Sequence, residues 1–214
     1  MADRLLVSAA TEQDGQTGTT LFVVDPTTAG VQVTPTAVIS GDSLAEVEFT
    51  NVVLPADAQV GPAQGAWPVL GEVLEQAKVA LSAMMVGGAQ GALTLAVHYS
   101  KERVQFDRPI GSFQALQMKM ADVAAGVEGA RWLTYEAAWR IARGKPFSLE
   151  AARAKAFASD AYQRATAEGI QLMGGYGVSE EYDMQLYYRR AILNKVLFGS
   201  DDHNRELVAQ FDLG

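Results

Sequence analysis

The chain has 214 residues, of which 49% are hydrophobic, and it carries a net charge of −8. It is long enough to bury one large core or two small ones, and its acidic balance without any basic run argues against nucleic acid as a partner. Cysteine is absent and only two histidines occur, so neither disulfides, thiolate chemistry nor a metal centre is expected. The N-terminal residues MADRLLVSAAT lack an apolar run of signal-peptide length, which predicts a cytoplasmic protein.

The N-terminal part of the chain predicts a small antiparallel β-domain. Short β-rich runs occur at Leu5–Val7, Leu21–Val24 and Val31–Val33, the first two separated by a linker of Gly, Gln and Thr. From Ala45 to Leu54 apolar and polar residues alternate, as in a half-buried strand. A sheet this small exposes its edges and an apolar face. The loop Pro55–Pro68, with three prolines and two glycines, predicts a domain boundary.

An uncharged segment of 22 residues follows between Lys78 and Lys101, with Gly87 and Gly91 at GxxxG spacing. It is long enough to cross a bilayer, and this glycine spacing is typical of paired membrane helices. However, the segment contains polar residues such as Gln90, is only weakly apolar, and has no aromatic belt at its start. We therefore favour a small-residue helix, buried on nearly all sides, in a soluble bundle without a membrane. A membrane helix dimer is the rival interpretation.

The segment Ser100–Gln117, SKERVQFDRPIGSFQALQ, predicts a helix, a turn and a second helix. Arg103 and Phe106 lie about one turn apart on the first helix, Pro109 breaks it, and Ser112 can cap the next. A guanidinium beside an aromatic ring suits a dinucleotide, because the cation can bind pyrophosphate while the ring covers adenine. The alternative is a solvated tip above a core residue.

The remaining residues predict a helical bundle. Apolar and small residues at spacings of three and four predict a long helix from Ser112 to Arg143. Three serines can cap three further helices, the last of which ends near Phe211: Ser148, Ser179 and Ser200. The predicted fold class is α+β and mostly α: a partial antiparallel β-domain, residues 1–60, followed by an antiparallel four-helix bundle with a short terminal helix, residues 66–214.

A second motif, QLMGGYG at Gln171–Gly177, supports a family resemblance. The two motifs together resemble the hallmark ERxxF...PIxxFQ and QxxGGxG segments of acyl-CoA dehydrogenases. The matching residues are Glu102, Arg103, Phe106, Pro109, Ile110, Phe113 and Gln114, then Gln171, Gly174, Gly175 and Gly177. The resemblance implies that residues 1–60 are the C-terminal part of the family's middle β-domain and that residues 66–214 are its C-terminal helical domain.

The resemblance also implies a chemistry. In this family a carboxylate removes the α-proton of an acyl-CoA thioester while hydride leaves for FAD, so the reaction needs a base fixed close to the α-carbon. The implied contacts to the ADP half of a neighbouring subunit's FAD are Arg103, Phe106, Gln114, Gln171, Gly174 and Gly175, with Ser200 as a further cofactor contact. Lys78 falls where the family often has an arginine near the CoA substrate.

The chain departs from the family at the base. The usual glutamate belongs to an EGT-like segment that here is FGS, so Phe198 stands at the glutamate position. An alternative base position, on the first long helix, falls at Ala77. We therefore expect no catalytic residue in this chain. The nearby Glu75 should face away from the direction of Ala77 and be a solvated surface acid.

The resemblance implies further that the family's N-terminal helical domain and the first part of its β-domain have no counterpart before Met1. Whether the chain alone is an enzyme is left open, and we expect it to be inactive by itself. The first interpretation is an FAD-associated acyl-CoA dehydrogenase-like chain. The alternative is a non-catalytic subunit or assembly partner of a heteromeric acyl-CoA dehydrogenase. In either case we expect a homo-oligomer or a hetero-oligomer with a paralogous chain. A truncated gene model is a third possibility.

Overall fold

The computed structural model describes residues 2–13 and 15–213, which divide into two units that meet between Val73 and Leu74. In the first unit, β1 (Leu5–Gln13) pairs antiparallel with β2 (Gln16–Val24), and β2 pairs with β5 (Gln59–Val60). A separate sheet joins β3 (Val31–Thr36) to β4 (Leu44–Phe49), and the short helix η1 (Ala56–Ala58) precedes β5.

The linker predicted between the first two strands is wrong, because most of it belongs to the strands. Both β1 and β2 are nine residues long. Threonine is β-branched and suits an extended backbone. Across the pair, the hydroxyls of Thr11 and Thr20 lie 2.7 Å apart and share a hydrogen bond. Such polar cross-strand contacts extend the ladder beyond the apolar runs that the sequence shows.

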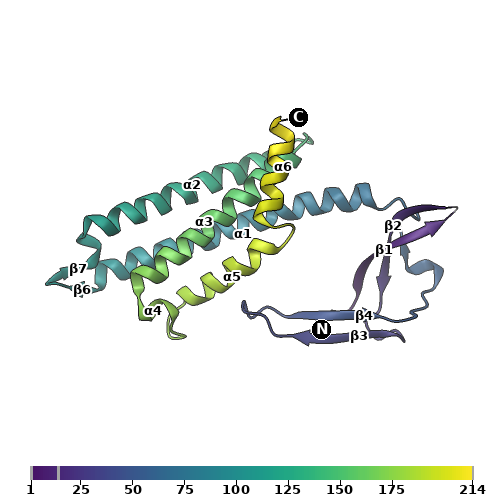
Figure 1. Cartoon of the computed structure of the whole chain (residues 1–214), viewed down its shortest axis with the longest axis horizontal. Coiled ribbons are helices and arrows are strands. Elements are labelled where there is room, and N and C mark those ends of the chain that lie inside the picture. Colours follow the sequence, from purple (N-terminus) through teal and green to yellow (C-terminus); the bar gives the residue numbers. More distant parts are fainter. Residues whose placement is uncertain (1, 14, 214) are drawn as a thin grey trace. The chain divides into compact units, whose positions relative to one another are not determined.

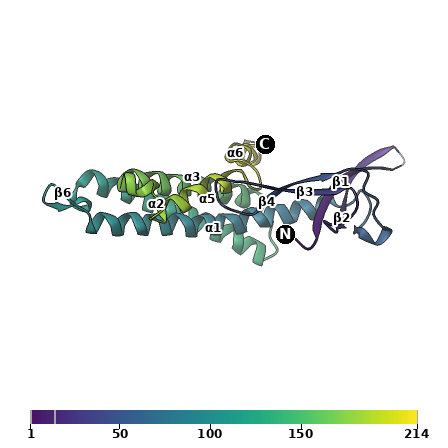
Figure 2. The same cartoon turned by 90° about the horizontal axis from the view of Figure 1, so that it is seen from below.

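The second unit is helical. Its long helices are α1 (Trp67–Glu102, which begins ahead of Leu74), α2 (Gln114–Ala142), α3 (Ser148–Met173), α5 (Met184–Val196) and α6 (Asp201–Leu213). The short elements are β6 (Val104–Gln105), β7 (Arg108–Pro109), η2 (Ile110–Ser112) and α4 (Gly175–Val178). Helices α1, α2, α3 and α5 lie side by side, and α6 crosses them away from the β6–β7 hairpin (Figures 1 and 2). The predicted fold class, α+β and mostly α, is confirmed.

Glycines on α1 allow two tyrosines to pack closely against it. A Cβ added at Gly88 would lie 2.5 Å from the Tyr162 ring, and one at Gly91 would lie 2.8 Å from the Tyr187 hydroxyl. Tyr162 belongs to α3 and Tyr187 to α5. Of the two glycines at GxxxG spacing, Gly91 therefore serves packing within this unit, whereas Gly87 is exposed and a Cβ added there would meet nothing within 4 Å.

Helix α1 is only partly covered within its unit. It is long and apolar enough to cross a membrane by length and composition, and half of its most apolar window is buried. An exposed strip that includes Ala80, Met84 and Gly87 runs along it, and Met84 is 67% exposed. The prediction that this helix is buried on nearly all sides is therefore wrong.

The predicted serine caps are correct at only one helix. The Ser112 hydroxyl donates to the Pro109 carbonyl at 2.7 Å instead of capping α2. Ser148 is already the first residue of α3, and the helix predicted to start at Ser179 begins instead at Met184, as α5. Only Ser200 is confirmed, because its hydroxyl accepts the backbone N–H of His203 at 3.2 Å and so satisfies a free donor of α6.

Burial of Tyr162 makes a pH dependence testable. Burial, together with a smaller effect of the nearby Tyr187, raises the pKa of Tyr162 to about 12. An unfolded phenol ionises near pH ~10, so between about pH 10 and 12 the folded state holds more protons than the unfolded state. The free energy of unfolding must therefore fall as the pH rises through this window.

We expect the wild type to lose about 2 kcal/mol more than Tyr162→Phe between about pH 9 and pH 11.5, because the variant has no phenol to ionise. Urea unfolding of both proteins at several pH values measures this difference. The variant keeps every other ionisable group of the chain, so the difference between the two proteins reports on the Tyr162 phenol. Parallel stability curves for the two proteins would show that the Tyr162 phenol does not control this loss.

Candidate functional site

Arg103 and Phe106 lie in a β-hairpin, so the prediction that both are on a helix is wrong. Helix α1 ends at Glu102, and the hairpin pairs Gln105 with Arg108. The backbone N–H of Ile110 closes it by donating to the Arg103 carbonyl at 2.8 Å. The two residues of the turn, Phe106 and Asp107, have φ of 55° and 62°. Positive φ at both central residues is what a type I′ hairpin turn requires.

The hairpin presents Phe106 to solvent in a strained conformation. Phe106 is 85% exposed, and its ring lies edge-on to Phe113 at a centroid distance of 6.1 Å. The guanidinium carbon of Arg108 lies 4.0 Å from the centre of the same Phe113 ring. A bulky residue with positive φ is rare, and such a conformation costs on the order of 1 kcal/mol or more. Strain of this kind clusters at functional sites and supports a binding role for the hairpin tip.

The two motifs meet in space through Arg103 and Tyr176. The guanidinium carbon of Arg103 lies 5.9 Å from the ring centre of Tyr176, which belongs to α4 and to the second motif. Arg103 is exposed, and in the described part of the chain no carboxylate forms an ion pair with it. Its hydrogen-bond donors are thus available to an anion. Sequence analysis missed Tyr176, whose only signal was an aromatic residue between the glycines.

The glycines of the second motif differ in their surroundings. A Cβ on Gly174 or Gly175 would meet nothing within 4 Å, and both residues are exposed. At Gly177 a Cβ would lie 2.8 Å from the Cα of Ile170, so this glycine lets α4 pack directly on α3. Open space beside Gly174 and Gly175 leaves their backbone accessible to a ligand.

The other predicted cofactor contacts, Gln114, Gln171 and Ser200, are exposed. Gln114 is the first residue of α2 and Gln171 lies in the last turn of α3. No hydrogen bond joins either side chain to another predicted contact among residues 2–13 and 15–213. The Ser200 hydroxyl caps α6. The cofactor roles of Gln114, Gln171 and Ser200 stay predictions.

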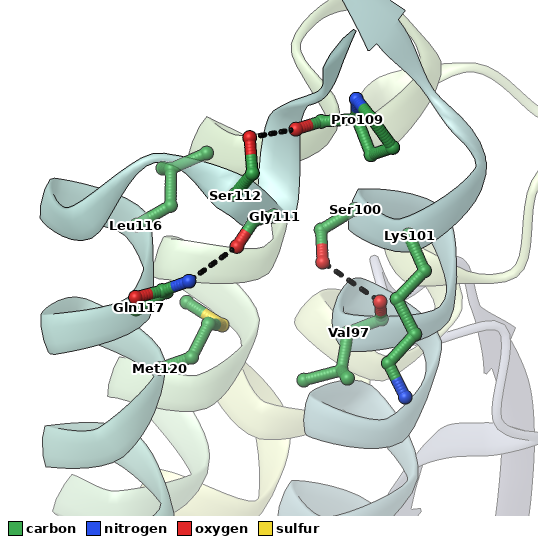
Figure 3. A pocket seen from close by; sticks show the side chains of 9 residues that line it. All are labelled: Val97, Ser100, Lys101, Pro109, Gly111, Ser112, Leu116, Gln117 and Met120. Atoms are coloured by element: carbon green, nitrogen blue, oxygen red, sulfur yellow. Dashed lines mark hydrogen bonds between the residues drawn. The ribbon is translucent and has the colours of Figure 1, made fainter.

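A pocket of about 330 Å³ lies beside the hairpin, between the end of α1 and the start of α2 (Figure 3). Its lining residues are Val97, Ser100, Lys101, Pro109, Gly111, Ser112, Leu116, Gln117 and Met120. Gln117 donates to the Gly111 carbonyl at 3.0 Å, and Ser100 donates to Val97 at 2.7 Å. The Gln117 and Ser100 side chains are thus engaged locally, and none of the predicted site residues lines this pocket.

The turn between α5 and α6 carries Phe198, the residue that the family resemblance predicts at the base position. Phe198 has φ of 54° and Gly199 has φ of 97°, and the Phe198 side chain is 41% exposed. The buried Asn204 amide holds this turn by donating to the carbonyls of Gly199 at 3.1 Å and Ser200 at 2.9 Å. A phenyl ring has no proton acceptor, so this turn offers no general base at residue 198.

A buried charged cluster that the sequence did not reveal supports this turn. Lys155 of α3 is fully buried, donates to the Lys195 carbonyl at 3.2 Å, and lies 3.9 Å from Oδ1 of the buried Asp201. The other oxygen, Oδ2, accepts from Gln163 at 3.2 Å and lies 3.6 Å from Nζ of Lys195. Burial lowers the pKa of Lys155, and the Asp201 carboxylate opposes that shift.

Two residues beside Ala77, the predicted alternative base position, form an ion pair with each other. Lys78 is buried, and its Nζ donates to Oε1 of Glu75 at 2.8 Å. Glu75 is therefore not a solvated surface acid: residues three apart on α1 share a face, and the pair is largely covered. Ala77 between them is half-buried and carries no ionisable group. In the described part of the chain no cluster of histidine or carboxylate side chains could hold a metal ion.

The fold and the two joined motifs define a chain of the acyl-CoA dehydrogenase type. Residues 64–212 match the family described as acyl-CoA dehydrogenase, C-terminal domain. The chain belongs to the acyl-CoA dehydrogenase family.

Solved structures share the fold over nearly the whole chain. Butyryl-CoA dehydrogenase from Megasphaera elsdenii is 33% identical, with a TM-score of 0.92 over 100% of this chain and 57% of the other. The ChsE4–ChsE5 complex from Mycobacterium tuberculosis is 28% identical, with a TM-score of 0.89 over 99% of this chain and 56% of the other. The structure of PigA with FAD and proline is 25% identical, with a TM-score of 0.91 over 99% of this chain and 56% of the other. This chain therefore spans about half the length of the relatives it matches.

The buried cluster predicts an asymmetry between two substitutions. Asp201→Asn should lower the free energy of unfolding by about 3 to 5 kcal/mol, because it leaves the buried Lys155 without its carboxylate. Lys155→Met should be milder, because Asp201 retains Lys195 and Gln163 as partners. Urea unfolding at neutral pH measures both values. A larger loss for Lys155→Met than for Asp201→Asn would contradict the assigned partners.

Proposed function

We propose that this chain works within an acyl-CoA dehydrogenase assembly, where it contacts the ADP half of a neighbouring subunit's FAD and supplies no catalytic base. One observation carries the proposal: the exposed Arg103, without a carboxylate partner in the described structure, lies against Tyr176 of the glycine motif. A guanidinium offers paired donors that suit a pyrophosphate. When bound, FAD accepts the hydride in this family's reaction.

The remaining contacts are assigned by their positions around Arg103. Phe106 supplies an exposed aromatic face for adenine, and Gly174 and Gly175 offer backbone without a Cβ in the way. PigA, whose structure contains FAD, supports a flavin in this fold, and the ChsE4–ChsE5 complex supports an assembly of related chains. Gln114, Gln171 and Ser200 complete the proposed set.

The chemistry of the proposal follows from the two predicted base positions, neither of which carries a carboxylate. With Phe198 and Ala77 at the two places where the family carries a carboxylate, no residue of this chain is assigned to remove the α-proton. A base within a paralogous subunit, acting on an acyl-CoA thioester, would complete the reaction. The buried Lys78 can act as a cation near CoA only when the hydrogen bond from its Nζ to Glu75 is broken. The cytoplasmic location is part of the same proposal.

The ADP contact is tested by binding of ADP to the full chain. Arg103→Ala should weaken ADP binding about tenfold or more, because charge-assisted hydrogen bonds to a buried or partly buried anion contribute roughly 1.5 to 3 kcal/mol. NMR titration gives the dissociation constants even when binding is weak. The matched control is Arg164→Ala. Arg164 lies on α3 and forms an exposed ion pair at 3.2 Å with Asp122 of α2. Equal ADP affinity of the wild type and Arg103→Ala would reject the proposed contact.

The absence of a base is tested in an assembly with a complete paralogous subunit. Phe198→Ala should change acyl-CoA turnover by less than about twofold, because a phenyl ring takes no part in proton transfer. Arg103→Ala in the same assembly should lower the flavin content. In the chain by itself, neither the wild type nor Phe198→Glu should oxidise acyl-CoA. Loss of turnover in Phe198→Ala, with flavin content and assembly intact, would show that this residue has a role in the reaction.

A further inference from the structure

We propose that Tyr176 is a positioning residue, which holds the guanidinium of Arg103 in place for the phosphates of its ligand. The inference rests on the proposed function, because it concerns how the ADP contact is prepared. Its first support is the 5.9 Å separation between the Arg103 guanidinium carbon and the Tyr176 ring centre. A cation within about 6 Å of an aromatic ring face is attracted to it.

The Tyr176 ring is itself fixed by two further tyrosines, Tyr99 and Tyr182, which with Tyr176 form the tyrosine cluster. Tyr176 packs on Tyr182 at a centroid distance of 5.2 Å and on Tyr99 at 6.1 Å. Tyr99 and Tyr182 meet edge-to-face at 6.5 Å, which closes the cluster. Tyr99 lies near the end of α1, only four residues before Arg103. The cluster therefore joins the element that carries the arginine to the element that carries the glycines.

The backbone beneath Tyr176 is equally constrained. Gly177 is buried against Ile170 of α3, where a Cβ would come within 2.8 Å of the Ile170 Cα. Its N–H also donates to the Gly174 carbonyl at 2.9 Å. A ring on such a fixed backbone loses little freedom when it holds a partner. By contrast, a long arginine side chain on a surface normally populates many rotamers, which a ligand must order at a cost in affinity.

Tyr176 is 42% exposed, so part of its ring is free to face solvent while the cluster covers the rest. This geometry restricts Arg103 on one side and leaves its donors open on the other. A tyrosine at residue 176 therefore raises affinity through Arg103, without a hydrogen bond of its own to the ligand. Phenylalanine at the same position should work as well, whereas leucine should not.

The direct test is the mobility of the Arg103 side chain in the free protein. The order parameter of the Arg103 Nε–Hε bond, measured by NMR relaxation of the full chain, should be high in the wild type and in Tyr176→Phe. It should fall in Tyr176→Leu, which keeps an apolar side chain but has no ring. The matched control is Tyr188→Leu, because Tyr188 on α5 is similarly exposed, at 39%, and has no ring contact with Arg103. Unchanged order in Tyr176→Leu would overturn the proposal.

The second test is a double-mutant cycle on ADP affinity. Tyr176→Leu should weaken ADP binding about two- to fivefold, as expected for an exposed cation–π contact, and Tyr176→Phe should restore it. On the Arg103→Ala background, Tyr176→Leu should have no further effect, because Tyr176 acts only through Arg103. An undiminished effect on that background would mean that Tyr176 contacts the ligand directly, which overturns the proposal.

The two tests separate the failure of this inference from failure of the proposed function. If the wild-type chain does not bind ADP, the proposed function is rejected, and the order parameter still decides whether Tyr176 restrains Arg103. If ADP binds through Arg103 but the order parameter does not depend on the ring at residue 176, only the positioning role is rejected.

Discussion

The helical unit depends on the close approach of two tyrosines to a glycine face of α1. A methyl group at Gly88 would lie 2.5 Å from the Tyr162 ring, so any larger residue there would displace the ring or the helix α3 that carries it. Gly91 plays the same part toward Tyr187 of α5. These contacts set the alignment of α1 with α3 and α5. The end of α1 and the end of α3 consequently lie at the same end of the bundle (Figure 1), where the hairpin meets α4.

Much of this helical architecture could be predicted from the sequence because its signal is periodic. The spacing of small and apolar residues along α2 is local information, and the Ser200 cap needs only its own helix. The other serines were misjudged because a hydroxyl can be used elsewhere, as Ser112 shows by donating to Pro109. A cap depends on which of several nearby carbonyls and amides is closest, and a sequence pattern does not show that.

The candidate site was only half predictable, for a related reason. Arg103 and Phe106 could be named from their motif, but the hairpin that carries them has strands of two residues and a turn without glycine. No periodicity can develop over so short a segment, and Phe is a poor match to a positive φ. Tyr176 and the Lys155–Asp201 pair become visible only when distant segments are brought together. Burial of a lysine in particular reflects neighbours from other helices, which its own helix pattern does not encode.

The two ends of the helical unit, one with Arg103 and Tyr176 and the other with Phe198, are supported independently. Helix α5 has 13 residues, about 20 Å of length, between the region of the tyrosine cluster and the turn that carries Phe198. One end is held by the tyrosine cluster and the buried Gly177, and the other by Asn204 and the Lys155–Asp201 pair. No residue of the described chain belongs to both supports. A phenyl ring at residue 198, which cannot take up a proton, therefore leaves the support of Arg103 and Tyr176 at the other end unchanged.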